Sequence, residues 1–284
     1  MVICAATKGP SPIMLKTIKS LFGKSLFSSG PEPILPAVPH GERIYAVGDV
    51  HGRLDLMVAL AEAIEADDRR RGQADTTVIL LGDLVDRGPD SAGVIKAAGL
   101  WAQQRSVRFI AGNHEEMFLE SFGNIETLRH FLKYGGRETI LSYPIDPALY
   151  SAAELEDLQA LMAEVVPEED LAFLRGFEDT IIKGDYLFVH AGISPGVAVS
   201  DQRTSHLRWI REPFLSHSGK HSHVVVHGHT ITAEAEVLSN RIGIDTGAYD
   251  SGKLTALGLE GSDRWLIETR DDSGAISTAM RNAA

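Results

Sequence analysis

Three short runs of sequence, GDVHG at residues 48–52, GDLVDRG at 82–88 and GNHE at 112–115, organise the chain. Each run follows a segment rich in β-branched and apolar residues, which is typical of a buried strand, and helix-like segments separate the runs. The expected strands are residues 43–47, 76–81 and 107–111, and the expected helices between them are residues 54–70 and 91–104. Parallel strands joined by crossover helices present their carboxyl ends at one edge of a sheet, where ligand sites form. The three runs are therefore expected to meet in one site.

The polar residues of these runs are suited to binding a divalent metal ion. Asp49 and His51 are two residues apart, so on extended backbone their side chains point to the same side. Asp83 adds a second carboxylate, and Asn113 adds a neutral amide oxygen. Carboxylate, imidazole and amide donors together suit Mn²⁺, Fe²⁺ or Zn²⁺, in contrast to a thiolate site. A single Gly-Asp-x-His run is common at strand ends, whereas three polar runs in register on a βαβαβ pattern indicate a metal site.

Two histidines in the second half of the chain occupy similar positions. Residues 186–189 form an apolar run that leads into His190, and residues 223–226 lead into a His-Gly-His sequence that ends at His229. Either histidine alone is most simply a polar turn residue. Together, each beside a glycine, they are candidates for a second metal site.

The three runs resemble the signature motifs of the phosphoprotein phosphatase superfamily of two-metal phosphoesterases, in particular its bacterial and bacteriophage lambda-type Ser/Thr protein phosphatases. The resemblance begins at about Arg43 and extends to the C-terminus. It implies an α/β fold with one calcineurin-like metallophosphoesterase domain at residues 43–284, built as a four-layer α/β/β/α sandwich of mixed sheets. Residues 116–177, which are mostly helical by pattern, would form an insertion that is either a lid over the site or a structural cap.

By this resemblance, Asp83 is shared between two divalent metal ions. The first ion would be held by Asp49, His51 and Asp83, and the second by Asp83, Asn113, His190 and His229. Mn²⁺ is the expected ion at both positions, with Fe²⁺ and Zn²⁺ as alternatives. A carboxylate in place of Asn113 would cancel the positive charge that attracts a phosphate dianion.

The same resemblance assigns the catalytic and phosphate-binding roles. A hydroxide held by the metal ions would attack the phosphorus atom directly, without a covalent phosphoenzyme. His114 would protonate the leaving oxygen as general acid, and Asp86 would orient the imidazole and favour its protonated form. Arg87 and Arg211 would hold the remaining phosphate oxygens through their guanidinium forks, and Arg208 is the alternative to Arg211.

The expected reaction is hydrolysis of phosphomonoesters, with phosphoserine and phosphothreonine in proteins as the first substrate class. The alternative is a symmetrical diadenosine tetraphosphate hydrolase, which would also accept dinucleotide-capped RNA ends. Asp86 favours the protein phosphatase, because hydrolases of the alternative class often lack an acid at this position. A third hypothesis is an inactive scaffold that uses the fold only for binding, and a complete set of ligands with a candidate acid argues against it.

The composition fits a soluble enzyme of the cytoplasm, and the resemblance implies a phosphorylated protein or a small phosphoester as its partner. The formal net charge of −12 argues against a general nucleic-acid binder. The single cysteine, Cys4, excludes an internal disulfide and fits a reducing compartment. No apolar run approaches the ~20 residues that a transmembrane helix requires.

The two ends of the chain differ in character from the middle. Residues 1–42 are rich in proline and glycine and are expected to form a flexible extension. Within them, residues 12–27 place apolar side chains at helical spacing with lysines between them. This segment is either a basic amphipathic contact for a membrane surface or partner, or part of a weakly ordered tail. Beyond Asp271 the sequence is small and polar, and it is expected to be frayed.

Overall fold

The computed structural model describes Met1 and residues 35–283, and a compact unit begins at Pro36. The amphipathic segment at 12–27 and most of the predicted extension at 1–42 lie outside the described residues. The first residues of the compact unit are held by backbone hydrogen bonds. The Ala37 N–H donates to the Asp185 carboxylate, and the N–H of the buried Val38 donates to the Gly261 carbonyl, both at 3.0 Å. In the described part of the chain, no helix is both long and apolar enough to span a membrane.

A six-stranded mixed sheet carries the three polar runs. Its strands, in spatial order, are β11 (Ala275–Asn282), β10 (Asp263–Asp272), β9 (Lys253–Glu260), β1 (Glu42–Val47), β2 (Asp75–Leu80) and β3 (Val107–Phe109). Strands β1, β2 and β3 are parallel, as predicted, and Val47, Leu80 and Phe109 lie side by side at their carboxyl ends. The crossover helices are α2 (Leu54–Arg71) and α3 (Ser91–Gln104). The three runs therefore follow these strands at one edge of the sheet.

A second, five-stranded sheet brings in the two histidines from the second half of the chain. Its spatial order is β4 (Thr180–Lys183), β5 (Tyr186–Val189), β6 (Val224–His227), β8 (Arg241–Gly243) and β7 (Glu236–Val237). The three inner strands are parallel, and the two edge strands are antiparallel to them. His190 directly follows β5, and His229 lies two residues after β6.

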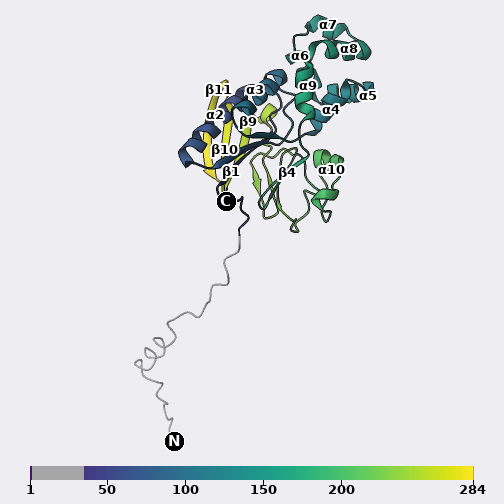
Figure 1. Cartoon of the computed structure of the whole chain (residues 1–284). Helices are drawn as coiled ribbons and strands as arrows, with labels where there is room; N and C mark the ends of the chain where they lie inside the picture. Colours follow the sequence, from purple (N-terminus) through teal and green to yellow (C-terminus); the bar gives the residue numbers. More distant parts are fainter. Residues whose placement is uncertain (2–34, 284) are drawn as a thin grey trace. The chain divides into compact units, whose positions relative to one another are not determined.

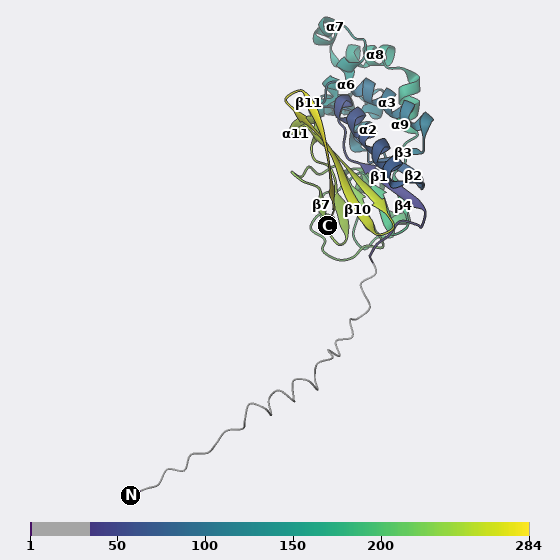
Figure 2. The same cartoon turned by 90° about the vertical axis from the view of Figure 1, so that its left-hand side faces the viewer.

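The two sheets pack against each other, and helices cover their outer faces (Figures 1 and 2). Apolar side chains such as Ile44 and Phe188 fill the space between the sheets, and fully burying one contributes about 1.5–3 kcal/mol. Helices α2 and α3 cover the first sheet, with Leu60 in that interface, and α10 (Thr204–Trp209) packs with Phe214 over the second sheet. The predicted four-layer α/β/β/α sandwich of mixed sheets is therefore confirmed.

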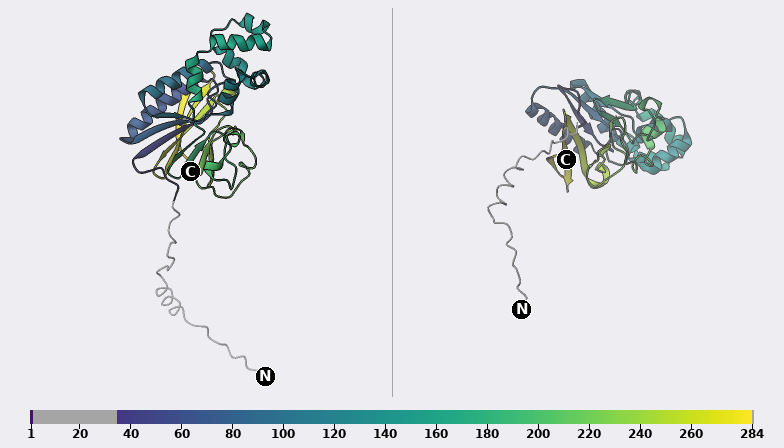
Figure 3. Two further views of the ribbon diagram at one scale, coloured as in Figure 1. Left: turned by 45° about the vertical axis from the view of Figure 1, so that its right-hand side comes forward. Right: turned by 90° about the horizontal axis from the view of Figure 1, so that it is seen from below.

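The insertion between the metal motifs is helical (Figure 3), and its apolar core also includes Val85 and Ile95, which lie outside it. Its elements are α4 (Asn113–Ser121), α5 (Ile125–Phe131), the π-helical turn η1 (Leu132–Gly136), α6 (Arg137–Ser142), α7 (Pro147–Ala152), α8 (Leu155–Val165) and α9 (Glu168–Arg175). The Phe118 and Phe131 rings stack in this core with their centroids 5.4 Å apart. The remaining short helices of the described chain are η2 (Val199–Asp201) and α11 (Ala248–Ser251).

The C-terminal segment differs from the sequence prediction. Residues beyond Asp271 were expected to be frayed, but Ala275–Asn282 form β11, which pairs with β10 along its whole length. Every residue of β11 is exposed, so the strand is an edge strand held by its backbone ladder rather than by burial of one face. Such a strand leaves no alternation of apolar and polar residues in the sequence.

Candidate active site

The backbone at several residues of the site has a positive φ, a conformation that residues other than glycine rarely adopt. Among the described residues, six non-glycine residues have positive φ, and five of them are predicted site residues. The five are His51, Asp83, Asp86, Arg87 and His229. Each such residue costs of order 1–3 kcal/mol, and this strain tends to gather at functional sites. The strand ends are therefore shaped to direct these side chains toward one another.

Asp83 lies at the centre of the site, with three histidine rings directed at its carboxylate. Its Oδ2 atom lies 3.4 Å from His190 Nε2, 3.6 Å from His51 Nε2 and 4.0 Å from His114 Nε2. Although burial opposes the shift, these histidines hold the pKa of Asp83 well below its usual range. Two groups of donors share Asp83, one with His51 and His114 and the other with His190 and His229, and the donor atoms of each group lie within 4.8 Å of one another.

The hydrogen bonds of two histidines leave a lone pair directed into the site. His51 Nδ1 lies 2.8 Å from the Val85 carbonyl, and His190 Nδ1 lies 2.8 Å from the Leu81 carbonyl. A carbonyl oxygen can only accept, so each Nδ1 carries a proton, and each Nε2 faces the site, where it meets Arg87 (His51) or Asn113 (His190) and can bind a cation when the ring is neutral. Histidines that bind metal ions almost always donate their other ring N–H in this way. The donor chemistry therefore fits divalent metal ions.

Asn113 and Asp49 both contact His229, but in different ways. Asn113 Oδ1 lies 2.8 Å from His229 Nδ1, so the amide oxygen belongs to the second group of donors. Asp49 accepts the backbone N–H of His229 at 3.0 and 3.2 Å, and its carboxylate lies beside that of Asp245. Burial and the carboxylates of Asp245 and Asp83 raise the pKa of Asp49 well above its usual range. Within the described chain, Asp49 therefore lies beside the centre but in neither group of donors, and its role as a ligand remains a prediction.

Glu115 has a positioning role that the sequence analysis did not assign. Its Oε2 atom accepts the N–H groups of Asp83 and Gly112 at 2.8 and 2.9 Å, and its Oε1 atom accepts the Leu84 N–H at 2.7 Å. Close approach of the two runs also needs Gly82, which has φ +98°, because a Cβ there would lie 2.6 Å from the Gly112 nitrogen. The buried Glu115 carboxylate thus fixes the loop that presents Asp83.

Asp245 is a second buried carboxylate that the sequence analysis did not place in the site. It lies two residues after β8, the inner strand beside β6, so it reaches the same sheet edge as the predicted ligands. Its Oδ1 atom accepts the Gly247 N–H at 2.9 Å while its side chain contacts Asp49. The signal that could have revealed it is its position after a short apolar strand, which is the same signal that indicated His190 and His229.

The predicted acid pair is formed in the structure. His114 Nδ1 lies 2.5 Å from Asp86 Oδ2, and both side chains are buried. Although burial opposes the shift, the carboxylates of Asp83 and Asp86 raise the pKa of His114 above its usual value. The other carboxylate oxygen of Asp86 accepts the hydroxyl of Thr139 at 2.6 Å, and the same hydroxyl accepts the Asp86 N–H at 2.8 Å. Thr139, from α6 of the insertion, therefore fixes the Asp86 carboxylate through the oxygen that does not contact His114.

Thr139→Val is expected to lower the turnover of an alkyl phosphate about 10- to 100-fold, the usual effect of removing a group that orients a residue touching the reacting centre. Valine keeps the shape of threonine but leaves Asp86 without its hydroxyl donor. The measurement is kcat on phosphoserine for Thr139→Val beside Thr139→Ser, which retains the hydroxyl and is expected to remain active. Wild-type turnover by Thr139→Val would show that Asp86 is positioned without it.

The insertion also contacts the loop that carries Arg87. The Arg87 N–H donates to the Gly135 carbonyl at 3.0 Å, and Gly135 has φ +106°. A Cβ at Gly135 would lie 2.8 Å from the Arg87 nitrogen, so only glycine permits this approach. The insertion is thus built into the active site through Gly135 and Thr139, and is not a detached lid. Tyr143 is buried in the core of the insertion and donates to Asp170 at 2.9 Å, which places it away from the site.

The structure separates the two candidate phosphate-binding arginines. A cavity of about 230 Å³ opens over the centre. It is lined by Asp83, Arg87, Asn113, His114, Met117, His130, Tyr134, Trp209, Arg211 and His229. Arg211 is exposed at this cavity, and its Nη2 atom donates to the His229 carbonyl at 3.3 Å. Arg208 instead pairs with Asp179 and Glu116 at 2.7 and 2.9 Å. Arg211 therefore lines the cavity whereas two carboxylates hold Arg208, and phosphate binding by Arg211 remains a prediction.

Comparison with known proteins agrees with this geometry. Residues 42–255 match the calcineurin-like phosphoesterase family model. The chain is 26% identical over 239 residues to an asymmetrical bis(5'-nucleosyl)-tetraphosphatase of Bacillus velezensis, covering 74% of this chain and 86% of that protein. It is 32% identical over 133 residues to a symmetrical bis(5'-nucleosyl)-tetraphosphatase of Klebsiella pneumoniae, covering 45% of each chain.

Two solved structures share the fold at 17–18% identity. One is assigned provisionally to the diadenosine tetraphosphatases and has a TM-score of 0.56, covering 87% of this chain and 98% of the other. The second is a cold-active protein-tyrosine phosphatase of a psychrophilic Shewanella species with a TM-score of 0.51, covering 85% and 83%. The family match extends over most of the chain and includes the strand-end residues described above. This chain therefore belongs to the calcineurin-like phosphoesterases, a family of metal-dependent phosphoester hydrolases.

Proposed function

We propose that this protein hydrolyses dinucleoside polyphosphates, with diadenosine tetraphosphate as the representative substrate. The supporting observation is the alignment with the tetraphosphatase of Bacillus velezensis, which extends over 86% of that protein. The shorter alignment with a symmetrical tetraphosphatase reaches a higher identity, 32%. These relatives favour the alternative of the sequence analysis over the phosphoserine and phosphothreonine phosphatase that Asp86 suggested.

In this proposal, the donors around Asp83 hold two divalent metal ions, with Mn²⁺ as the expected ion. The proposed ligands are Asp49, His51, Asp83, Asn113, His190 and His229. Bound ions of this kind activate water and neutralise the charge of phosphoryl oxygens. The Arg87 guanidinium spans the site, because its two terminal nitrogens lie 2.9 Å from His51 Nε2 and 2.8 Å from His114 Nε2. It is placed to turn from these rings to the oxygens of a phosphate group, with Arg211 at the mouth of the cavity.

A second activity on phosphomonoesters is favoured by the His114–Asp86 pair. The leaving group of a phosphoanhydride is itself a phosphate, which departs with little help from an acid. A serine or threonine alkoxide, in contrast, needs a proton as it leaves. The Nδ1 atom of His114 lies 2.5 Å from a buried carboxylate, so the imidazole can supply that proton from Nε2 once Arg87, now 2.8 Å from Nε2, has turned to the phosphate. We therefore expect turnover of phosphoserine and phosphothreonine peptides at a lower rate than that of diadenosine tetraphosphate.

Chromatography of the reaction products tests the proposed function. With Mn²⁺ present, diadenosine tetraphosphate is expected to be consumed, chelation is expected to abolish the reaction, and added Mn²⁺ is expected to restore it. ATP with AMP would show asymmetrical cleavage, as in the Bacillus relative, whereas two molecules of ADP would show symmetrical cleavage. Absence of nucleotide products from a preparation that hydrolyses a phosphopeptide would reject the proposal.

A further inference from the structure

Exposed aromatic rings gather around the active site. Among the tyrosine and tryptophan residues that the structure describes, the three most exposed are Tyr134, Trp209 and Tyr249, with exposed fractions of 42%, 37% and 36%. Tyr134 and Trp209 line the cavity over the centre. The Tyr249 ring packs edge-on against His51, with centroids 5.4 Å apart, and lies under the Arg87 guanidinium at 4.8 Å. Among the tyrosine and tryptophan rings of the described residues, Tyr134 and Trp209 are therefore the two that border the cavity.

The size of the cavity places a nucleoside at its rim. Pockets that enclose a drug-sized ligand measure about 300–1,000 Å³, whereas this cavity measures about 230 Å³. It has room for phosphate groups beside Arg87 and Arg211, and its small size favours a position of the nucleoside at its rim. The ring of a phosphotyrosine is joined directly to its phosphate and would have to enter the cavity. In a nucleotide substrate, a ribose and a further phosphate separate the base from the reacting phosphate. The base can therefore lie at the rim of the cavity, beside Tyr134 and Trp209.

Both rings are positioned by neighbouring side chains. Trp209 Nε1 donates to Glu116 Oε1 at 2.9 Å, and the other oxygen of Glu116 accepts from Arg208 at 2.9 Å. The Tyr134 ring packs on the His130 ring, with centroids 4.6 Å apart. A ring that is already held loses little freedom when a ligand stacks on it, so more of the stacking energy appears as affinity.

We propose that Tyr134 and Trp209 are two stacking platforms for the bases of a nucleotide substrate whose phosphates lie between Arg87 and Arg211. This inference rests on the proposed function and names the groups that separate a nucleotide from a phosphopeptide. Aromatic side chains beside a cationic groove bind bases of any sequence, because every base has a π face. The two rings come from different elements, η1 and α10, so each can receive one base of a dinucleotide.

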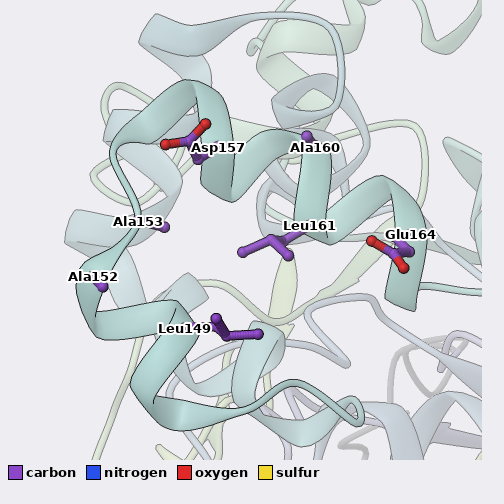
Figure 4. Close-up of a pocket in the computed structure, with 7 residues that line it drawn as sticks. All are labelled: Leu149, Ala152, Ala153, Asp157, Ala160, Leu161 and Glu164. Atoms are coloured by element: carbon purple, nitrogen blue, oxygen red, sulfur yellow. The ribbon is translucent and has the colours of Figure 1, made fainter.

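The groove between α7 and α8, at the far end of the insertion, does not offer a comparable site (Figure 4). Leu149 and Leu161 line it, and the charged residues that the structure describes in its lining are Asp157 and Glu164. Two carboxylates repel a polyphosphate, so this groove does not compete with the active site for nucleotides.

Calorimetric titration of the full chain with Mn²⁺ tests the platforms through two ligands that resist hydrolysis. One is α,β-methylene-ADP, and the other is methylenediphosphonate, which has the same phosphonate groups without the nucleoside. The double variant Tyr134→Ala/Trp209→Ala is expected to bind the nucleotide analogue about tenfold or more weakly, the effect of losing one base–aromatic stack. Its affinity for methylenediphosphonate is expected to fall much less. The double variant Tyr134→Phe/Trp209→Phe keeps an aromatic ring at each position, although phenylalanine at 209 loses the hydrogen bond to Glu116, and it is expected to retain most of the nucleotide affinity.

Tyr150→Ala is the matched control, because Tyr150 belongs to the same insertion but lies on α7, outside the lining of the cavity. It is expected to bind both ligands like the wild type. Equal losses for both ligands in the alanine double variant, or no loss for either, would overturn the platforms. A protein that binds the nucleotide analogue through these rings but does not hydrolyse diadenosine tetraphosphate would refute the proposed function and leave the platforms standing. If diadenosine tetraphosphate is hydrolysed but neither its turnover nor nucleotide binding depends on the two rings, the platforms are refuted and the proposed function stands.

Discussion

Asp83→Asn is expected to lower hydrolysis of every phosphate ester by at least about a thousandfold, because metal ions supply several kcal/mol of transition-state stabilisation. Asp83 is the residue that the two groups of donors share, and three histidine rings lie within 4.0 Å of its Oδ2 atom. Asparagine keeps the side-chain oxygen, Oδ1, that accepts the backbone N–H of His114 at 3.0 Å, so the fold should survive the change. The loss of one negative charge weakens both metal positions together. The measurements are kcat/KM and bound metal per chain.

Asp146→Asn is the matched control for this change of carboxylate to amide. Asp146 caps α7 by accepting the Ala148 N–H at 2.8 Å, and asparagine caps a helix equally well. We expect this variant to keep wild-type activity and metal content. Asp83→Asn with wild-type turnover, or with unchanged metal content, would show that Asp83 does not hold both ions.

His114→Asn is expected to retain bound metal but to lose about 10²–10⁴-fold in rate on phosphoserine, the range for loss of a general acid. The ring lies 2.5 Å from Asp86 and is directed toward Asp83 from a position next to Asn113. The loss should shrink on p-nitrophenyl phosphate and on diadenosine tetraphosphate, because their leaving groups need little protonation. Parallel kinetics on the three substrates check this order. An equal loss on all of them would assign His114 a positioning role instead.

The fold was predictable because its decisive elements follow simple patterns. Strands β1, β2 and β3 are apolar runs that end in polar residues, and the helices between them are long enough to show their periodicity. The edge strand β11 was missed because all its residues are exposed, so burial left no pattern to read. The layer count came from the resemblance, since periodicity does not reveal which face of a sheet meets another sheet.

The site was predictable where a residue follows a strand and less so where contacts cross the chain. Thr139 lies 53 residues from Asp86, and a threonine within a helix gives no sign of such a partner. The choice between Arg208 and Arg211 depended on which side chain pairs with Asp179, and spacing does not show this. Within the insertion, Tyr134 is exposed whereas Tyr143 is buried, and short helices with kinks do not reveal in the sequence which face points inward.

One residue, Asp86, was not enough to predict the substrate class. The contact between Asp86 and His114 supports the prediction that the site can protonate a poor leaving group, and such a capacity would not exclude substrates that leave without it. Substrate choice in such a site depends on groups beyond the metal ions, and we propose that here these include Tyr134, Trp209 and Arg211, which line the cavity. Asp86 alone therefore favours phosphomonoesters as substrates without deciding against dinucleotides.

The ratio of kcat/KM for diadenosine tetraphosphate to that for a phosphoserine peptide, measured with the full chain and Mn²⁺, tests the central claim most directly. We predict that the ratio is well above one, and that it falls toward one in the Tyr134→Ala/Trp209→Ala double variant. A ratio below one in the wild type would contradict the claim and would instead support the protein phosphatase that Asp86 first suggested.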